Sequence, residues 1–319
     1  MPRSREFEII ERFFTRPVTD PAIEVGIGDD AAVVDVAGRL AIAVDTIVAG
    51  THFPDPTPAR AIGHRVLAVN LSDLAALGSR PRWATLALSL PASDLAWVEE
   101  FAAGFFALAE QHGVSLIGGD TVRGALAATV QVMGDVGDAP LLRSGGRVGD
   151  LVFVSGSLGD SAAGLACAGG EAELNTPAAT ALIERFRYPE PRVDLGLALG
   201  GIARAAIDIS DGLVVDLGRI CSQSRCGAEI ELDSLPLSAA LRAEFPDDRA
   251  TELALHGGDD YELCFTAAPA DAAAIEDLGA RVGTPVTQIG RLTEGSGVVG
   301  SSGGNRFDLV PAGFGHFGT

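Results

Sequence analysis

The sequence predicts a mixed α/β (α+β) protein of two domains, and three observations support this prediction. Apolar runs of strand length occur in both halves among amphipathic stretches of helical period, without strict alternation of the two. The 319 residues suffice for two ordinary domains, each with its own core. The Gly- and Arg-rich segment 141–150 separates two series of such elements. We therefore expect an N-terminal α/β domain over residues 1–140 and a C-terminal α/β domain over residues 141–319.

Apolar spacing predicts the elements of the N-terminal half. Phe7, Ile10, Phe13 and Phe14 are expected on one face of a short first helix. Glycine and proline mark the ends of these elements, because glycine often ends a helix and proline cannot continue a strand ladder. In order, we expect a helix over 4–14, a strand over 40–48, a helix over 58–78, a strand over 83–91, a helix over 93–112 and strands over 114–120 and 126–136.

The C-terminal half begins with a strand–turn–helix unit in LVFVSGSLGD (151–160). The segment AAIDISDGL (205–213) reads as a strand that runs into the N-terminus of a helix. Further strands are expected over 228–233 and 261–267, with Ala- and Leu-rich helices between them. The Ser- and Gly-rich stretch 295–305 predicts a surface hairpin or loop.

Charge and composition exclude several classes of function. The net charge of −20 argues against a nucleic-acid partner, because phosphate backbones require clustered Lys and Arg. The chain contains no lysine, so a Walker A loop, a pyridoxal Schiff base and the strand lysine of protein kinases are all excluded. A protein of this composition that handles nucleotides must rely on metal ions, backbone amides and arginines.

Targeting signals and metal-binding cysteines are not expected. The start of the chain, MPRSREFEIIERFF, carries charges where a signal peptide needs an apolar stretch. No apolar run is long enough to span a membrane. Four sparse cysteines with no second pair and no close histidine fit a reducing compartment better than a zinc site. We therefore expect a cytoplasmic protein.

Six segments combine an apolar run with an acidic residue beside Gly, Ser or Thr. Alone, each is typical of a turn or a helix cap. Six such segments at the ends of strands or helices instead predict one shared site. Carboxylates gathered at one site repel each other unless a cation lies between them. Oxygen ligands suit Mg²⁺, so the residues predict a Mg²⁺-dependent site for phosphorylated ligands, with scattered acidic turns as the alternative. The segments are GIGDD (26–30), AVDT (43–46), NLSD (70–73), IGGDT (117–121), DISDG (208–212) and HGGDDYE (256–262).

The chain also resembles the thiamine-monophosphate kinase family, within the superfamily of aminoimidazole-ribonucleotide synthetase and selenophosphate synthetase. The resemblance runs in order from about residue 5 to the C-terminal GFGHF, through GIGDDAAVV, VDTIVAGTHF, NLSDLAALGSRPRWATLALSLP, LIGGDT, IDISDGL and GGDDYELCFT. It implies direct in-line transfer of the γ-phosphoryl group of ATP onto thiamine monophosphate, with several Mg²⁺ ions. It also implies a homodimer with paired N-terminal sheets, an N-terminal domain that binds ATP and Mg²⁺, and a C-terminal domain that completes the substrate site.

The resemblance also implies roles for individual residues, without a general base, because the acceptor is already an ionised phosphate. Metal-binding positions match Asp30, Asp45, Asp73, Asp120, Asp208 and Asp211, with Asp29 supporting the first. ATP contacts match Gly119, Asp120, Arg143 and Ser210, of which Arg143 supports catalysis. Thiamine contacts match His52, Asp259 and Phe314.

Two departures from the family pattern concern ligand geometry. Ala43 and Val44 stand where hydroxyl residues often precede Asp45, so any metal contact there must come from a backbone carbonyl or a water. Asp259 stands where many members have Glu, which is one methylene longer.

Two alternatives remain open at this point. One is a sister ATP-dependent synthetase, similar to aminoimidazole-ribonucleotide synthetase. The other is a non-catalytic sensor of nucleotide or metal. A selenophosphate synthetase is disfavoured, because the first cysteine is Cys167 and there is no lysine.

Overall fold

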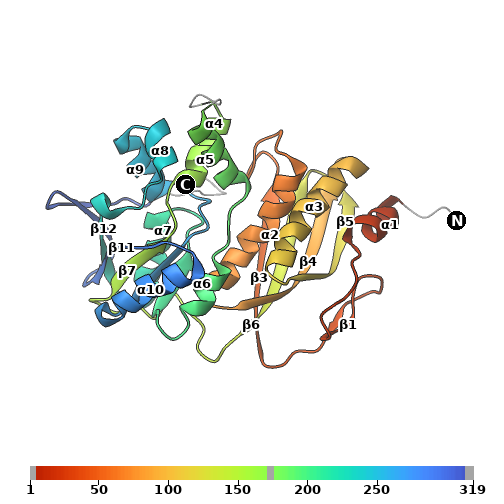
Figure 1. The fold of residues 1–319 in the computed structure, drawn as a ribbon, viewed down its shortest axis with the longest axis horizontal. Coiled ribbons are helices and arrows are strands. Elements are labelled where there is room, and N and C mark those ends of the chain that lie inside the picture. The colour runs from red at the N-terminus through yellow and green to blue at the C-terminus, as the bar shows by residue number, and fades with distance from the viewer. Residues whose placement is uncertain (1–4, 171–175, 313–319) are drawn as a thin grey trace. The chain divides into compact units, whose positions relative to one another are not determined.

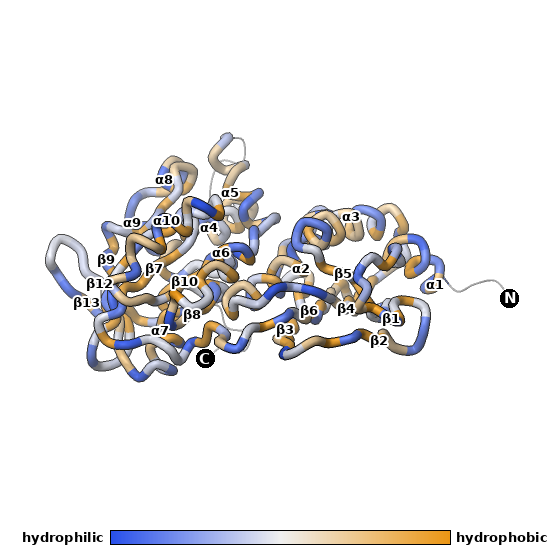
Figure 2. The backbone as a smooth tube through the Cα atoms, turned by 60° about the horizontal axis from the view of Figure 1, so that its bottom comes forward, coloured by the Kyte–Doolittle hydropathy of each residue, from blue (hydrophilic) through white to orange (hydrophobic). Residues whose placement is uncertain are grey.

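The computed structural model describes residues 5–170 and 176–312, and its contacts divide the chain into two compact units (Figure 1). The N-terminal unit comprises the described residues up to Leu74 and Ser79–Gly137, and the C-terminal unit comprises Ala75–Gly78 and the described residues from Asp138 onwards. Each unit holds its own sheet and helices, so the predicted mixed α/β class is confirmed. Figure 2 shows apolar positions along the strands and helices of each unit. None of the helices in the described ranges has the length and hydropathy needed to cross a membrane.

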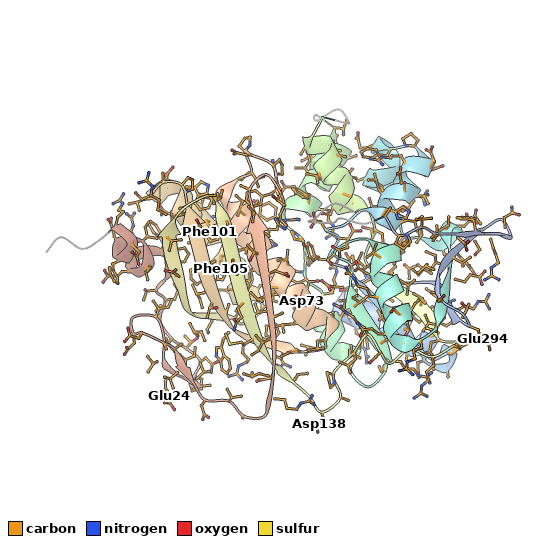
Figure 3. The ribbon with its side chains drawn as sticks, turned by 180° about the vertical axis from the view of Figure 1, so that it is seen from behind. Glu24, Asp73, Phe101, Phe105, Asp138 and Glu294 are labelled. Carbon is orange, nitrogen blue, oxygen red and sulfur yellow. The ribbon has the colours of Figure 1, made fainter. Side chains whose placement is uncertain are left out.

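The N-terminal unit is built on a four-stranded sheet. Its strand order is β3 (Arg39–Val48), β6 (Ala127–Val136), β4 (Arg80–Leu90) and β5 (Ser115–Arg123), and only β4 and β5 run parallel. All four strands were expected within a few residues of these bounds, because each contains an apolar run that the sheet buries. Helices α2 (Ala59–Ala76) and α3 (Leu95–Gln111) cover one face, in front of the sheet in Figure 1 and behind it in Figure 3.

Two glycines let α2 and α3 approach each other closely. A Cβ atom at Gly63 of α2 would lie 2.0 Å from the carbonyl oxygen of Phe101, and one at Gly104 of α3 would lie 1.9 Å from that of Arg60. Both distances are far below van der Waals contact, so the two backbones touch only because these side chains are absent. Phe101 and Phe105, which belong to the same stretch of α3, are fully buried.

The start of the chain differs in detail from the predicted helix. Helix α1 (Arg5–Ile9) continues as a π-helical segment, Ile10–Phe14, with a wider turn. Phe13 and Phe14 are buried as expected, but Ile9 joins them and Phe7 is 61% exposed. The wider turn rotates the later residues relative to α1, so a single helical period over 4–14 assigns Phe7 to the wrong face.

A short ladder of β1 (Ile23–Val25) and β2 (Val33–Val34) flanks the GIGDD segment. The apolar run after Asp30 pairs with β1 and is not part of the four-stranded sheet. Ile23 of this ladder packs against Trp83 and Ile117 of the main sheet. The ladder thus fixes the two ends of the loop that carries Asp29 and Asp30.

The C-terminal unit contains a seven-stranded sheet. Its strand order is β13 (Asn305–Asp308), β12 (Gly297–Ser302), β9 (Gly227–Glu231), β11 (Val286–Thr293), β7 (Leu151–Ser155), β10 (Leu263–Ala267) and β8 (Ala205–Asp208). β12 and β13 form the hairpin expected near 295–305, and its turn is Gly303–Gly304 with both φ angles positive. The helices are α4 (Asp160–Ala168), α5 (Pro177–Arg187), α6 (Val193–Ala198), α7 (Leu213–Ser224), α8 (Ala239–Glu244), α9 (Asp247–His256) and α10 (Ala272–Val282).

The contact between α2 and α3 yields a stability prediction. Gly63→Ala forces a methyl group onto the Phe101 carbonyl, so we expect it to lower the free energy of unfolding by about 2 kcal/mol or more. Gly218→Ala in α7 is the matched control, because nothing lies within 4 Å of its added Cβ. There the better helix propensity of alanine should stabilise the protein by about 0.5–1 kcal/mol. Urea unfolding of the three proteins measures both effects, and equal stability of Gly63→Ala and the wild type contradicts the close backbone contact.

Candidate functional site

In the C-terminal unit, the DISDG segment (208–212) and the GGDDYE segment (257–262) lie side by side. Strands β8 and β10 pair antiparallel, and the pairing continues beyond the end of β8. The backbone N–H of Tyr261 donates to the Ile209 carbonyl at 2.9 Å, and the N–H of Asp259 donates to the Ser210 carbonyl at 2.8 Å. Two segments about 50 residues apart are thereby joined, one with predicted ATP and metal contacts and the other with a predicted substrate contact.

A buried carboxylate in α7 shapes the DISDG loop. Asp216 Oδ2 accepts hydrogen bonds from the backbone N–H groups of Ser210, Asp211 and Gly212 at 2.9–3.2 Å. Burial raises the pKa of Asp216 to about 6, while the loop N–H groups and Arg219 oppose that rise. The side chain is fully buried and closes the loop into a narrow turn above the start of α7.

The guanidinium of Arg219 also holds this loop. It bonds to the carboxylate of Asp216 and, through its other terminal nitrogen, to Asp211. Asp211, a predicted metal contact, is thus paired with an arginine, whereas Asp208 is a buried residue at the end of β8. Sequence reasoning missed both Asp216 and Arg219, although an acidic residue on the apolar face of LVVDL was a visible signal.

In the N-terminal unit, a buried asparagine links β3 to α2. Asn70 Oδ1 accepts from the backbone N–H of Asp45 at 2.9 Å, and its amide donates to the Val66 carbonyl at 2.9 Å. Asp73 follows one helical turn after Asn70, near the C-terminal end of α2 (Figure 3). The structure therefore brings the predicted metal residues Asp45 and Asp73 to the same junction of strand and helix.

Asp30 and Asp29 lie on the loop between β1 and β2, where both are exposed. The Oδ1 atom of Asp29 accepts from the backbone N–H of Asp30 at 2.8 Å. Asp29 thus shapes the turn that presents Asp30.

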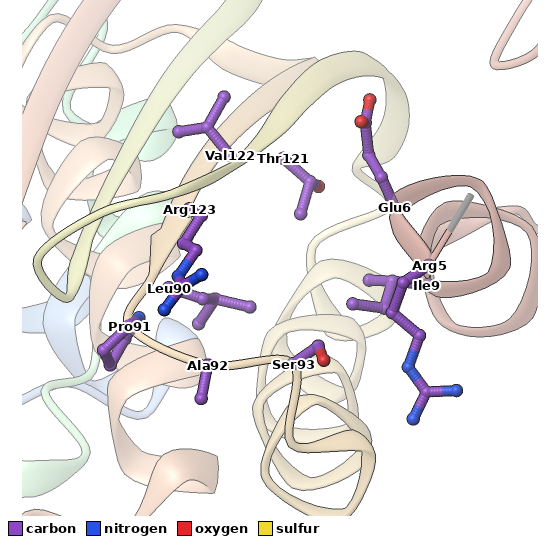
Figure 4. A pocket seen from close by; sticks show the side chains of 10 residues that line it. All are labelled: Arg5, Glu6, Ile9, Leu90, Pro91, Ala92, Ser93, Thr121, Val122 and Arg123. Carbon is purple, nitrogen blue, oxygen red and sulfur yellow. The ribbon is translucent and has the colours of Figure 1, made fainter.

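Asp120 sits beside a glycine that no other residue can replace. Gly119 has a φ of 153°, and an added Cβ would lie 1.9 Å from the Leu86 carbonyl oxygen. Asp120 Oδ1 accepts from the Thr121 N–H at 2.9 Å. Gly119 and Asp120 line a small cavity of about 40 Å³, and Thr121 lines both this cavity and a neighbouring pocket of about 620 Å³. Figure 4 shows the larger pocket between the start of α1 and the ends of β4 and β5, with Arg5, Ser93 and Arg123 on its walls.

Asp45 and Asp120 lie within strands and not at strand ends, which corrects the expectation that all six acidic segments end an element. Backbone pairing continues past each aspartate, and the strand register puts Asp45 and Asp120 on opposite faces of the sheet. Two strands separate β3 from β5, which puts them roughly 14 Å apart. One Mg²⁺ binds its oxygens at about 2.1 Å, so Asp45 and Asp120 of the same chain do not share an ion.

The remaining predicted site residues occupy loops. Nδ1 of His52, in the turn after β3, accepts from the Val48 N–H at 3.0 Å, which assigns the ring proton of a neutral imidazole to Nε2. Arg143 is exposed, and its carbonyl accepts from the Ser224 hydroxyl at 2.8 Å. Phe314 lies outside the described residues. No group of three His, Cys, Asp or Glu side chains within 5–170 and 176–312 is arranged to hold a metal ion, and the metal roles remain predictions.

Comparison with known proteins assigns the family. Residues 28–136 match the N-terminal domain of AIR synthase related proteins, and residues 147–301 match their C-terminal domain. The thiamine-monophosphate kinase of Salmonella typhimurium is 44% identical over 98% of both chains. The crystal structure of thiamine-monophosphate kinase from Stenotrophomonas maltophilia is 46% identical, with a TM-score of 0.85 over 94% of this chain and 96% of the other. AaThiL complexed with AMPPCP and TMP is 34% identical, with a TM-score of 0.78 over 91% of this chain and 92% of the other. The chain therefore belongs to the thiamine-monophosphate kinase family.

Proposed function

We propose that this kinase transfers the γ-phosphoryl group of ATP in line onto the phosphate of thiamine monophosphate, giving thiamine diphosphate and ADP. The observation that carries the proposal is the backbone pairing of Ser210 with Asp259 at 2.8 Å. Ser210 matches an ATP contact and Asp259 a thiamine contact, and a phosphoryl transferase must hold its two substrates next to each other. The relative AaThiL has been solved with AMPPCP and TMP together, which supports the same pair of ligands here.

The acidic residues fit Mg²⁺ as the companion of ATP. Their donors are hard carboxylate oxygens, and the buried Asn70 ties Asp45 to the helix that carries Asp73. Bound Mg²⁺ would neutralise the charge of the two phosphorylated substrates. We assign several Mg²⁺ ions to these carboxylates. In the N-terminal unit they are Asp30, Asp45, Asp73 and Asp120, with Asp29 supporting Asp30. In the C-terminal unit they are Asp208 and Asp211.

The protein's own groups orient the substrates. Gly119 and Asp120 lie in β5 beside a small cavity, and Ser210 lies on the loop that Asp216 holds in shape. We assign ATP binding to these residues and to Arg143, whose charge suits a phosphate and supports transfer. His52, Asp259 and Phe314 are assigned to thiamine monophosphate. No general base is invoked, because the acceptor phosphate is already ionised.

We further propose that two copies of the chain pair through the open face of the N-terminal sheet. Ile42 and Val44 alternate along β3 and are 61% and 59% exposed, and the strand register places the exposed Val122 on the same face. Apolar side chains gathered on one sheet face fit the apolar core of a protein–protein interface.

The activity itself is the first prediction. Purified protein with Mg-ATP should convert thiamine monophosphate to thiamine diphosphate with equal release of ADP. Asp120→Ala should lower kcat/KM by at least about 100-fold without loss of thermal stability, because it removes a charge that acts on the ligands. Asp138→Ala, in a bend of the chain, is the matched control and should retain wild-type activity. ADP release at the same rate without thiamine monophosphate, or no release at all, contradicts the proposal.

Metal dependence gives a second prediction. Excess EDTA should abolish turnover, and added Mg²⁺ should restore it. Asp73→Asn should raise the Mg²⁺ concentration needed for half-maximal rate by about tenfold or more, because an amide is a weaker ligand than a carboxylate. Asp138→Asn should leave that concentration unchanged. An unaltered Mg²⁺ dependence of Asp73→Asn would remove Asp73 from the metal site.

The pairing of two copies is tested by mass in solution. Light scattering should give the mass of two chains for the wild type and of one chain for Val44→Glu, because a charge on the shared face opposes association. Val310→Glu is the control, since Val310 is 74% exposed in the C-terminal unit. A wild-type monomer, or a Val44→Glu dimer of wild-type affinity, would refute pairing through this face.

A further inference from the structure

The segment that carries Asp259 has an unusual backbone. Asp259 and Tyr261 have φ angles of 69° and 51°, in the left-handed region that residues with a side chain rarely adopt. Arg225, at the C-terminus of α7, is the only other such non-glycine residue within 5–170 and 176–312. Two left-handed residues separated by one position are strained, and such a conformation persists only when the surrounding structure fixes it.

Two buried carboxylates next to Tyr261 supply that restraint. Asp260 accepts from the backbone N–H groups of Gly159 and Ser161, at the start of α4, at 2.7 and 3.3 Å. Glu262 accepts two hydrogen bonds from Arg192, at 2.6 and 2.7 Å, and further ones from Arg185 and Ser155. Both carboxylates are at least 97% buried. Sequence neighbours on each side of Tyr261 are thus bonded to separate parts of the unit.

The strained backbone brings the side chains of Asp259 and Tyr261 together. The hydroxyl of Tyr261 donates a hydrogen bond to Oδ1 of Asp259 at 3.0 Å. Tyr261 is buried, with 9% of the residue exposed, so packing fixes the position of its ring, whereas Asp259 is only half-buried. Because the ring cannot move, its hydrogen bond restrains the orientation of the solvent-accessible Asp259 carboxylate.

We propose that Tyr261 is a positioning residue, which orients the carboxylate of Asp259 for a ligand with N–H donors such as the aminopyrimidine of thiamine monophosphate. The inference rests on the proposed function and adds a residue to it. A carboxylate turns readily about its Cβ–Cγ bond, and a bond from a rigid hydroxyl selects one orientation before the ligand arrives. Such a hydrogen bond suits this site, because the acidic side chain is an aspartate, which is short.

The test is Tyr261→Phe, which removes one oxygen and keeps the buried ring. KM for thiamine monophosphate should rise about tenfold, the size expected for a lost hydrogen bond to a charged group. KM for ATP and kcat should stay within about twofold of wild type, and thermal unfolding should be unchanged. Tyr188→Phe is the matched control, because Tyr188 is the only other tyrosine of the chain, and it should change neither KM.

A double-mutant cycle shows whether Tyr261 acts through Asp259. Asp259→Asn alone should raise KM for thiamine monophosphate, and adding Tyr261→Phe to it should raise that KM by less than twofold more. Wild-type KM values for Tyr261→Phe, or full additivity in the cycle, would overturn the inference and leave the proposed function standing. A joint change of kcat, both KM values and thermal stability would show a structural role only, which also overturns it. If the wild type fails to phosphorylate thiamine monophosphate, the proposed function and this inference both fail.

Discussion

The hydrogen bonds of the Asp216 carboxylate to three consecutive backbone N–H groups are the interaction on which the C-terminal part of the candidate site depends. They close residues 210–212 into a turn, and the carbonyls of Ile209 and Ser210 then meet the N–H groups of Tyr261 and Asp259. A buried carboxylate is expensive unless it is hydrogen-bonded, and here the loop and Arg219 provide its partners. The loop therefore keeps its shape through Asp216, and its N–H groups offset the free-energy cost of burying that carboxylate.

In both units, buried polar side chains form hydrogen bonds that fix the backbone beside residues proposed to bind ligands. Asn70 fixes the backbone at Asp45, and Asp260 and Glu262 fix the segment around Asp259. Such side chains are positioned by packing and hydrogen bonds before any ligand binds, which reduces the ordering that binding requires. The acidic residues proposed to bind ligands are mostly exposed or half-buried, so they remain within reach of solvent and substrates.

Much of the fold was predictable because apolar runs and turn residues in the local sequence indicate strands and hairpins. The strands β3, β4, β5 and β6 coincide with apolar runs, and the hairpin of β12 and β13 was signalled by its paired glycines. The order of the seven-stranded sheet was not predictable, because pairings such as β12 with β9 join strands far apart in sequence and leave no local signal. Phe7 was assigned to the wrong face because the periodicity argument assumed a regular α-helix where the structure has a π-helical segment.

The candidate site was predicted as a set of acidic segments, and the residues that hold those segments were missed. Asp216 sits where helical spacing predicts an apolar core residue, and its role is visible only once the N–H groups of the preceding loop face it. The choice among kinase, sister synthetase and sensor was left open by the residues, and relatives of 44% identity over 98% of both chains support the kinase.

We propose that the paired segments 208–212 and 257–262 hold ATP and thiamine monophosphate next to each other. A crystal structure of this chain with AMPPCP, Mg²⁺ and thiamine monophosphate tests it most directly. We expect nucleotide phosphate oxygens at hydrogen-bonding distance from Ser210, and the aminopyrimidine at hydrogen-bonding distance from Asp259 with the Tyr261 hydrogen bond intact. Thiamine monophosphate bound away from Asp259, or the two segments separated in the complex, would contradict it.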